Sequence, residues 1–488
     1  MTEKQFNWVI PNLSKTRPGR DIQEYIIKNI ILRNLKPGDK LPSHRKLGQL
    51  NHISDSTIKK AYFILIINDW LTSSPRAGIF VSYTIPNKVM PLRSKGFTDQ
   101  FPVDLHYANK IPQQKPTYTA EPFISIGTFT PSHALFPQET FNKYYLAQQR
   151  EALKTSQAQY LNTYNGAYLK DEVLNDLNRH RDFGIKPGMI EIIKGRRASL
   201  EAVFKLLLDK PGEVVINTSF YDPLLNDVLN NQEVTVCNIN PSDVKFLVNL
   251  QRILKSRTVR FIYVQTPSSF PDGNTLTRTT RQKLVEMAIK YKTCVIEEDK
   301  NHEYYYGELP YKPLACFEHA GHVIYMGVLS LATAYTQTLR VIVASVQLIT
   351  ALKVVTGQSV EPRDAIMENA LADMIAYGHL AAYQRHSRLK AKKNKCHLDS
   401  TLTNYLGKYI SYEQPEHGFT FWLKFRDDIN LNDLLKELQN RGIQIPYHPN
   451  ASKPKGKVNY MLLGFGHYLP MEAEAAAKEI QNILTFLP

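Results

Sequence analysis

The residues around Gly195 have the chemistry of an anion-binding segment. The glycine is flanked by basic side chains, and a hydroxyl side chain follows where a helix is predicted to start: Lys194, Arg196, Arg197 and Ser199. Helix N-termini and guanidinium groups bind phosphate and carboxylate groups well, and Arg340 supplies a further guanidinium. Two interpretations stay open. The arginines hold a phosphorylated ligand, or they fill the space where such a ligand would bind by forming ion pairs with the acids at 297–299.

The positive charge of the chain is concentrated near its N-terminal end. The 488 residues carry a net charge of +15, and residues 1–100 hold 16 Lys and Arg against 7 Asp and Glu. This length exceeds what one hydrophobic core supports, so we expect two or three domains. A basic N-terminal fifth on a nearly balanced remainder indicates an appended module for a polyanion such as nucleic acid.

The sequence shows no signal for a membrane or for export. The first fifteen residues lack an apolar signal region, and no run of about 18 apolar residues occurs. We therefore expect a cytoplasmic protein. The four cysteines are far apart and form no CxxC pair, so we expect buried thiols rather than disulfides or a metal site. They are Cys237, Cys294, Cys316 and Cys396.

Residues 20–50 have the pattern of two helices separated by a turn. Apolar residues recur near helical spacing over 20–34 and predict one amphipathic helix. A proline and a glycine then break this pattern, and Ser43 is suited to cap a second helix over 44–50.

A third helix and a β-hairpin follow. Ser54 or Asp55 is suited to cap a helix over 56–70, and two short strands surround a turn at 75–78. Three helices and a hairpin in this order predict a winged helix-turn-helix, whose third helix enters the major groove of DNA. We assign residues 1–83 to this DNA-binding domain.

Three segments resemble the DNA-binding domain of GntR-type bacterial regulators, over roughly residues 17–83: KPGDKLPSHRKLGQ, SDSTIKKAY and SPRAGIFV. The resemblance implies that an arginine, the start of the recognition helix and a wing glycine contact DNA. These residues are Arg45, Ser54, Ser56, Thr57 and Gly78. Further basic residues are expected on phosphates, which position the protein without reading sequence. They are Lys46, Lys59, Lys60 and Arg76.

One position departs from the GntR pattern. Asp55 stands where many relatives have an arginine. A carboxylate there repels phosphate but can accept a hydrogen bond from a cytosine amino group.

The rest of the chain has the pattern of a linker and an α/β body. Residues 84–122 hold six prolines and no clear apolar period, which predicts a linker. From residue 123 onward, apolar strands alternate with helices and predict a mostly parallel sheet. We expect a large domain over 123–360 and a small α+β domain over 361–488. Ligands of such sheets bind at the carboxyl ends of the strands.

Segments at those strand ends resemble fold-type I aminotransferases, which depend on pyridoxal phosphate and form the body of MocR-type regulators. The resemblance covers roughly residues 122–488 and includes KGRRASLEAVFKLLLDKPGEVV, FYDP, TPSSFPDG and VIEEDKNHEYYY. It implies that Gly195 admits the cofactor phosphate and that Tyr221 stacks on the pyridine ring. It also implies that Glu298 or Asp299 faces the ring nitrogen.

The lysine that binds this cofactor covalently is missing. An imine requires a lysine amine, but counting back from Leu339-Arg340 puts Thr333 at its place, and counting forward from Gly327 gives Leu331. Neither side chain forms an imine, so no covalent cofactor is expected. Reversible binding of pyridoxal phosphate or another phosphorylated ligand stays open.

Two further positions lack the side chains that the aminotransferase family uses for catalysis and substrate binding. Lys300 stands where the family has a phenol, and Leu462 where it has the arginine that pairs with the substrate carboxylate. An apolar side chain cannot replace a guanidinium. Lys300 could serve as an unorthodox imine-forming lysine, but Glu298 and Asp299 beside it would keep it protonated. We therefore favour an ion pair and expect no transaminase activity.

These features predict a DNA-binding transcription regulator of the MocR type. Its aminotransferase-like body would serve for dimerisation and effector sensing. The expected partners are a double-stranded operator, a second copy in a head-to-tail homodimer that reads paired half-sites, and a small anionic effector. Two alternatives are an active pyridoxal-phosphate enzyme with an unorthodox lysine and a purely architectural DNA-binding dimer.

Overall fold

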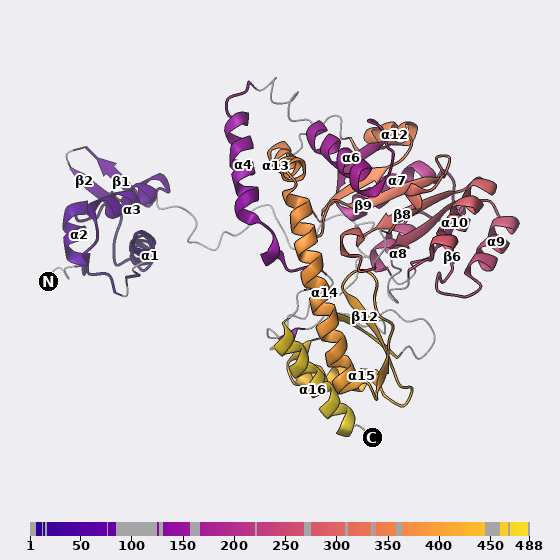
Figure 1. Ribbon diagram of the computed structural model, residues 1–488. Coiled ribbons are helices and arrows are strands. Elements are labelled where there is room, and N and C mark those ends of the chain that lie inside the picture. Colours follow the sequence, from indigo (N-terminus) through magenta and orange to yellow (C-terminus); the bar gives the residue numbers. More distant parts are fainter. Residues whose placement is uncertain are drawn as a thin grey trace. The chain divides into compact units, whose positions relative to one another are not determined.

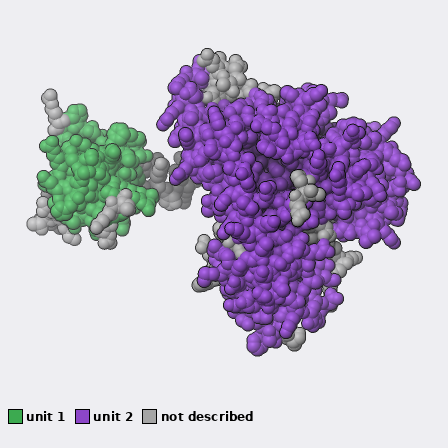
Figure 2. All heavy atoms as spheres, viewed as in Figure 1, with its two compact units in different colours: residues 1–116 green, residues 117–488 purple. Residues whose placement is uncertain are grey.

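The computed structural model of the chain divides into two compact units, residues 1–116 and 117–488 (Figure 2). The described residues are 6–11, 13–14, 17–75, 77–83, 124–125, 130–156, 166–219, 222–267, 275–307, 311–332, 336, 338–357, 364–444, 459–466 and 469–486. The predicted linker and three predicted site residues, Arg76, Tyr221 and Thr333, lie outside these residues.

Unit 1 is a bundle of three helices with a two-stranded hairpin (Figure 1). Its elements are α1 (Pro18–Ile31), α2 (His44–Asn51), α3 (Asp55–Ile67), β1 (Leu71–Ser74) and β2 (Gly78–Val81). Apolar side chains four residues apart, such as Ile22 with Ile26 and Ile58 with Tyr62, are buried in one core. The predicted order of a winged helix-turn-helix is confirmed.

Serine side chains begin two of these helices. Ser43 accepts a hydrogen bond from the N–H of Lys46 at 3.3 Å, and Ser54 accepts one from the N–H of Thr57 at 3.3 Å. Ser54, and not Asp55, is therefore the cap of the recognition helix α3. Such caps satisfy backbone N–H groups that have no partner within the helix.

A mixed seven-stranded sheet forms the centre of unit 2, in the order β4-β10-β9-β8-β7-β5-β6. The strands are β4 (Ile190–Lys194), β5 (Val214–Asn217), β6 (Thr235–Asn238), β7 (Val259–Thr266), β8 (Cys294–Asp299), β9 (Val323–Val328) and β10 (Leu339–Val343). Strand β10 is antiparallel to both its neighbours, and the remaining pairs are parallel. The carboxyl ends of β5, β7 and β8 therefore meet at one edge of the sheet.

Helices cover both faces of this sheet (Figure 1). On β7, Phe261 and Tyr263 pack towards α7 and α8, whereas Ile262 and Val264 pack towards α9 and α10, because side chains alternate along a strand. The helices of this lobe are α4 (Gln138–Ala152), α6 (Ala167–Arg181), α7 (Arg196–Leu207), α8 (Pro223–Asn230), α9 (Phe246–Ser256), α10 (Arg278–Lys290), α12 (Val346–Thr356) and α13 (Ala365–Ala376).

A smaller lobe follows at the C-terminal end. It is built from α14 (His379–Leu406), α15 (Leu431–Asn440), α16 (Pro470–Phe486) and the antiparallel strands β11 (Ile410–Ser411), β12 (Thr420–Phe425) and β14 (Tyr460–Gly464). A parallel pair joins β3 (Ile124–Ser125) to β13 (Ile443–Gln444). Short 3-10 turns lie at His133–Leu135, His302–Tyr304 and Leu314–Cys316.

Two sequence expectations need correction at this level. Helix α13 packs with α4 and α6, so by packing it joins the large lobe and not the small domain expected from residue 361. The thiols are less buried than expected, since Cys396 is exposed and the other three are only half-buried. Among the described residues, no helix is both long and apolar enough to cross a bilayer.

Candidate functional site

The start of the recognition helix presents a cluster of hydroxyl groups. Ser54 Oγ lies 3.1 Å from Ser56 Oγ and 2.7 Å from Thr57 Oγ1. Ser54 and Ser56 are exposed, and Thr57 is half-buried. Hydroxyl groups at the N-terminal end of a recognition helix are suited to phosphate oxygens and base edges. The structure thus brings together the three residues that the sequence nominated here.

Asp55 is held by two basic side chains of the same face. Its carboxylate lies 3.1 Å from Lys59 Nζ and 3.4 Å from His44 Nδ1. The pair with Lys59 is four residues apart on one helix, which is a favourable spacing. The acid that departs from the GntR pattern therefore also engages Lys59, one of the predicted phosphate contacts.

Three other basic residues that were predicted to contact DNA are exposed. Arg45, Lys46 and Lys60 form no ion pair with any residue in the described part of the chain. Their charges are free to bind phosphates. In the wing, Gly78 has φ +120°, and a Cβ there would lie 3.0 Å from Lys40 Cε. The hairpin therefore needs a glycine at this position.

In unit 2, Arg196 occupies the centre of a buried ion-pair network. Its Nε lies 2.5 Å from Glu298 Oε1, and its Nη2 lies 2.7 Å from Glu298 Oε2. The same guanidinium reaches Asp222 through Nη1 at 3.0 Å and Nη2 at 2.6 Å. One arginine at the first turn of α7 thus binds two carboxylates, one on β8 and one at the cap of α8.

Polar side chains from β7 and β8 complete the network. Lys300 Nζ lies 2.9 Å from Asp222 Oδ2 and 3.5 Å from Glu298 Oε2. Tyr263 donates a short hydrogen bond to Glu298, and Gln265 Nε2 donates to Asp222 at 2.8 Å. Burial would raise the pKa of Glu298, but Lys300 and Arg196 outweigh it and lower this pKa to about 2. Lys300 therefore forms ion pairs with Asp222 and Glu298, whereas the sequence suggested Glu298 and Asp299 as its partners.

Arg340 lies at the edge of the network without a full set of partners. Its Nη1 is 3.9 Å from Glu298 Oε1, and its Nε and Nη1 are buried without a hydrogen-bond partner. Burial lowers the pKa of Arg340, and the carboxylate of Glu298 acts in the opposite direction. Among the described residues, three cations, Arg196, Lys300 and Arg340, thus face the two carboxylates of Glu298 and Asp222, which leaves one positive charge in excess.

The other two acids of β8 serve different purposes. Asp299 accepts a hydrogen bond from Arg181 Nη2 at 2.6 Å and one from Tyr325 at 3.1 Å. Glu297 accepts hydrogen bonds from Thr266 and from two backbone N–H groups, and burial raises its pKa to about 7. Because side chains alternate along a strand, only Glu298 faces Arg196. The idea that all three acids pair with the arginines is therefore wrong.

Arg197 lies outside the network. It points to the surface, where it pairs with Asp227 at 2.6 Å and Glu201 at 3.4 Å, and its side chain is 46% exposed. Lys194 is also exposed. Ser199 Oγ donates to the carbonyl of Gly195 at 2.8 Å, and Gly195 adopts φ +95° as the cap of α7. The predicted anion-binding segment is thus split, with Arg196 inside and Arg197 outside.

Several residues of the network were missed by the sequence analysis. Asp222 comes from a distant part of the chain, and Tyr263 and Gln265 alternate along β7. Arg181, the partner of Asp299 outside the network, is equally distant in sequence. The alternation on β7 was a usable signal, since both side chains share a face with Glu298. Nothing local in the sequence indicated the partners of Asp222 or Arg181.

The acids that the resemblance assigns to the ring nitrogen of pyridoxal phosphate already have protein partners. Glu298 and Asp299, the two candidates for the ring nitrogen, are bound by Arg196 and Arg181. No lysine occurs from Tyr325 to Arg340, and the N–H of Leu331 donates to Glu303 at 3.2 Å. Leu462 is fully buried in β14.

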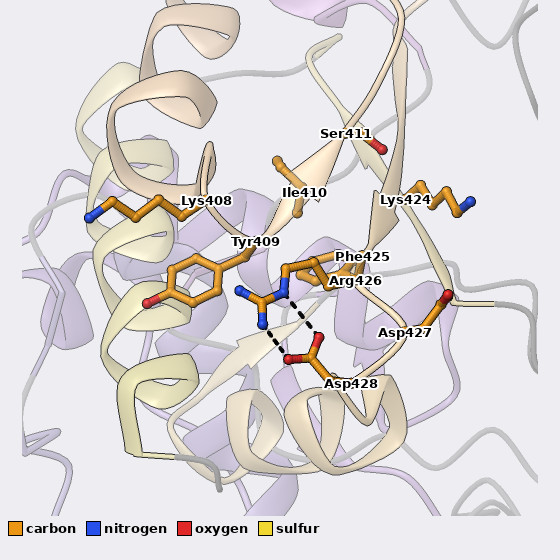
Figure 3. Close-up of a pocket in the computed structure, with 9 residues that line it drawn as sticks. All are labelled: Lys408, Tyr409, Ile410, Ser411, Lys424, Phe425, Arg426, Asp427 and Asp428. Carbon is orange, nitrogen blue, oxygen red and sulfur yellow. Dashed lines mark hydrogen bonds and ion pairs between the residues drawn. The ribbon is translucent and has the colours of Figure 1, made fainter.

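The hollows that the described residues line include two that lie outside the network. One, of about 450 Å³, lies beside β11 and β12 (Figure 3). The ammonium groups of Lys408 and Lys424 point away from each other there, and Arg426 pairs with Asp428. The charged groups therefore do not converge on one point at which a ligand could bind. The other hollow, of about 260 Å³, lies between α6, β9 and α14, with Tyr325 and His302 in its wall.

Comparison with known proteins identifies the class of unit 1. Residues 18–81 match the family described as bacterial regulatory proteins, gntR family. Unit 1 is therefore a GntR-type helix-turn-helix domain, as its sequence resemblance predicted.

Relatives extend this similarity to most of the chain. It is 20% identical over 439 residues to "Probable rhizopine catabolism regulatory protein MocR" of Rhizobium meliloti, which covers 87% of this chain and 85% of that protein. It is 22% identical over 465 residues to the uncharacterized HTH-type transcriptional regulator YhdI of Bacillus subtilis, which covers 93% and 92%. The predicted likeness to MocR-type regulators is confirmed.

The body has the fold of fold-type I aminotransferases. A kynurenine aminotransferase of Pyrococcus horikoshii superposes with a TM-score of 0.63 at 20% identity, over 76% of this chain and 93% of that chain. An archaeal alanine:glyoxylate aminotransferase superposes with a TM-score of 0.64 at 20% identity, over 74% and 90%. The predicted fold class, a winged helix-turn-helix followed by an aminotransferase-like body, is confirmed.

Proposed function

We propose that this protein is a DNA-binding transcription regulator whose aminotransferase-like body has no transaminase activity. The observation that carries the proposal is the Arg196 network, in which protein side chains bind Glu298 and Asp222 where a cofactor would be expected. Unit 1, in contrast, has an exposed basic recognition face. The two relatives reported above carry the names of a regulatory protein and of an HTH-type transcriptional regulator and match over most of this chain, which supports the proposal. The proposal includes a location in the bacterial cytoplasm, where an operator would be met.

The recognition face makes the proposed DNA binding testable. Replacing Arg45 and Lys60 with alanine removes two exposed cations, so the dependence of log K on log salt should flatten by about 1.8. The matched control is Lys28→Ala with Arg33→Ala, which removes the same charge from α1 and the turn that follows it. A salt slope that the first pair leaves unchanged would contradict the proposed interface.

The body is proposed to hold two copies together. Apolar side chains are exposed on α4 and just after α13, since Leu146, Leu153 and Tyr377 are 48%, 82% and 68% exposed. Such a patch supports a protein interface, and a two-fold dimer reads paired half-sites. Sedimentation at micromolar concentration should give a dimer, and a monomer would contradict this part of the proposal.

A small anionic effector is proposed for the network itself. The excess positive charge and the unpartnered N–H groups of Arg340 support this. Inorganic phosphate at a hundredfold excess over its dissociation constant would then stabilise the body by about 2.7 kcal/mol, and Arg340→Ala should remove the effect. Arg197→Ala is the control, because its side chain lies at the surface. The architectural alternative expects no stabilisation by any small anion.

An active pyridoxal-phosphate enzyme is the second candidate. The lysine that the sequence suggested for its imine, Lys300, lies between Asp222 and Glu298. An aldehyde would have to displace these two ion pairs before it could reach the amine. This geometry is the reason to rank the enzyme below the regulator.

A further inference from the structure

A run of basic residues lies on α14, outside both proposed sites. From His379 to Leu398 the sequence holds six Lys and Arg and no Asp or Glu. Five of the six are exposed, and we name these five the α14 basic face: Arg385, Arg388, Lys390, Lys392 and Lys393. The sixth, Lys395, is half-buried and lies over the ring of Tyr306 at 5.5 Å.

Acidic side chains do not neutralise this face. None of its five residues forms an ion pair with any residue that the structure describes. Acids on the elements packed against α14 have other partners: Glu474 pairs with His397 at 3.3 Å, and Glu303 accepts a hydrogen bond from Gln384 at 2.7 Å. The positive charge of the α14 basic face is therefore available to an external anion.

The spacing of these residues makes the helix repel itself. Arg388 and Lys392 are four residues apart, and Lys390 and Lys393 are three apart. Residues at these spacings are neighbours on a helix surface, and like charges there are destabilising. An exposed helix face more often alternates the sign of its charges. A polyanion would offset this repulsion.

We propose that the α14 basic face is a second DNA-contact surface, which binds the phosphate backbone of the duplex that unit 1 reads. This inference rests on the proposed DNA-binding function. The face extends over nine residues of helix, roughly 12 Å of axis, and the same length of duplex carries about seven phosphate charges. Because both units belong to one chain, DNA held by unit 1 has a raised effective concentration at the body.

The test uses the full chain and two random-sequence duplexes, one of about two helical turns and one of about six. We expect the wild type to show a steeper salt dependence on the long duplex, because that duplex offers more phosphates beyond those that unit 1 contacts. The variant carrying Arg388→Gln, Lys392→Gln and Lys393→Gln should lose about 2.7 from the slope on the long duplex. Its slope on the short duplex should match the wild type.

A matched variant separates a local effect from general charge loss. Lys205→Gln, Lys255→Gln and Lys283→Gln remove three exposed cations from α7, α9 and α10, and should leave both slopes close to the wild type. Equal effects of the two triple variants, or no dependence of the wild-type slope on duplex length, would overturn the inference.

Failure of the inference and failure of the proposed function give different results. Arg45→Ala with Lys60→Ala should flatten the slope on both duplexes if unit 1 binds DNA, whatever α14 does. The α14 variant should also keep or raise the melting temperature without DNA, because it removes repulsion. A lowered melting temperature would show that the cations stabilise the fold, and it would contradict the argument from self-repulsion.

Discussion

The recognition face of unit 1 and the Arg196 network of unit 2 use arginine and lysine in opposite ways. In unit 1, Arg45 and Lys60 are exposed and have no acid partner within the described residues. In unit 2, the side chain of Arg196 is 14% exposed, and its donors are bound by the carboxylates of Glu298 and Asp222. A cation that faces solvent can bind an external polyanion, whereas a cation satisfied inside the fold cannot bind a ligand without breaking its own pairs. The cations of the recognition face are thus available for binding, and Arg196 holds the fold of the body together.

The largest effect should come from breaking the network of the body. Arg196→Ala leaves two carboxylates in a buried site, and removing one partner of a buried ion pair costs about 3–5 kcal/mol. The midpoint of thermal or denaturant unfolding of unit 2 should fall accordingly, while DNA binding by unit 1 at low temperature should be retained.

The neighbouring arginine is the control for this variant. Arg197→Ala removes a pair whose side chains are 46% and 55% exposed, so it should change stability by no more than about 1 kcal/mol. If the two variants were equally stable, the contrast between a buried network and an exposed surface pair would be wrong.

Acid should weaken the network in a defined range of pH. The pKa of Glu298 is lowered to about 2 from an ordinary value of 4.5, so its ionised form stabilises the fold. This stabilisation is complete above about pH 4.5 and is lost as the pH falls towards 2. The difference in melting temperature between the wild type and Glu298→Gln should therefore be constant above pH 4.5 and shrink below it. A difference that persists unchanged to pH 3 would contradict this assignment.

Much of the fold was predictable because its signals are local. Caps, turns and apolar periods identified the three helices and hairpin of unit 1, and the order of strands and helices identified the body. Ser54 is an example, since an exposed serine before an apolar helical pattern suits a cap.

The network was only partly predictable because it is long-range. The sequence nominated Arg196 and Glu298, but Asp222 and Arg181 enter through folding. Arg196 is buried and Arg197 is exposed because only one side of the first turn of α7 faces the sheet. If the predicted start of a helix is wrong by one residue, the predicted direction of each side chain is wrong by about 100°. The sequence alone therefore could not decide which arginine is buried.

A smaller effect on DNA binding is expected from replacing Asp55 in unit 1. Asp55→Ala releases Lys59 and removes a negative charge from the recognition face, so DNA binding should tighten and the salt slope should steepen by about 0.9. Glu24→Ala breaks a comparable pair with Arg20 on α1 and serves as the control. If the two variants bind random-sequence DNA equally, Asp55 does not restrain Lys59 at the interface.

The most direct test of the central claim is to offer the cofactor to the purified full-length protein. Pyridoxal phosphate is added, borohydride is used to reduce any imine, and intact mass and tryptic peptides are measured. Because the network occupies Glu298 and ties up Lys300, we predict no pyridoxyl group on any lysine of the body and no transaminase activity. A stoichiometric adduct on Lys300 that depends on a folded body would contradict the account and restore the enzyme.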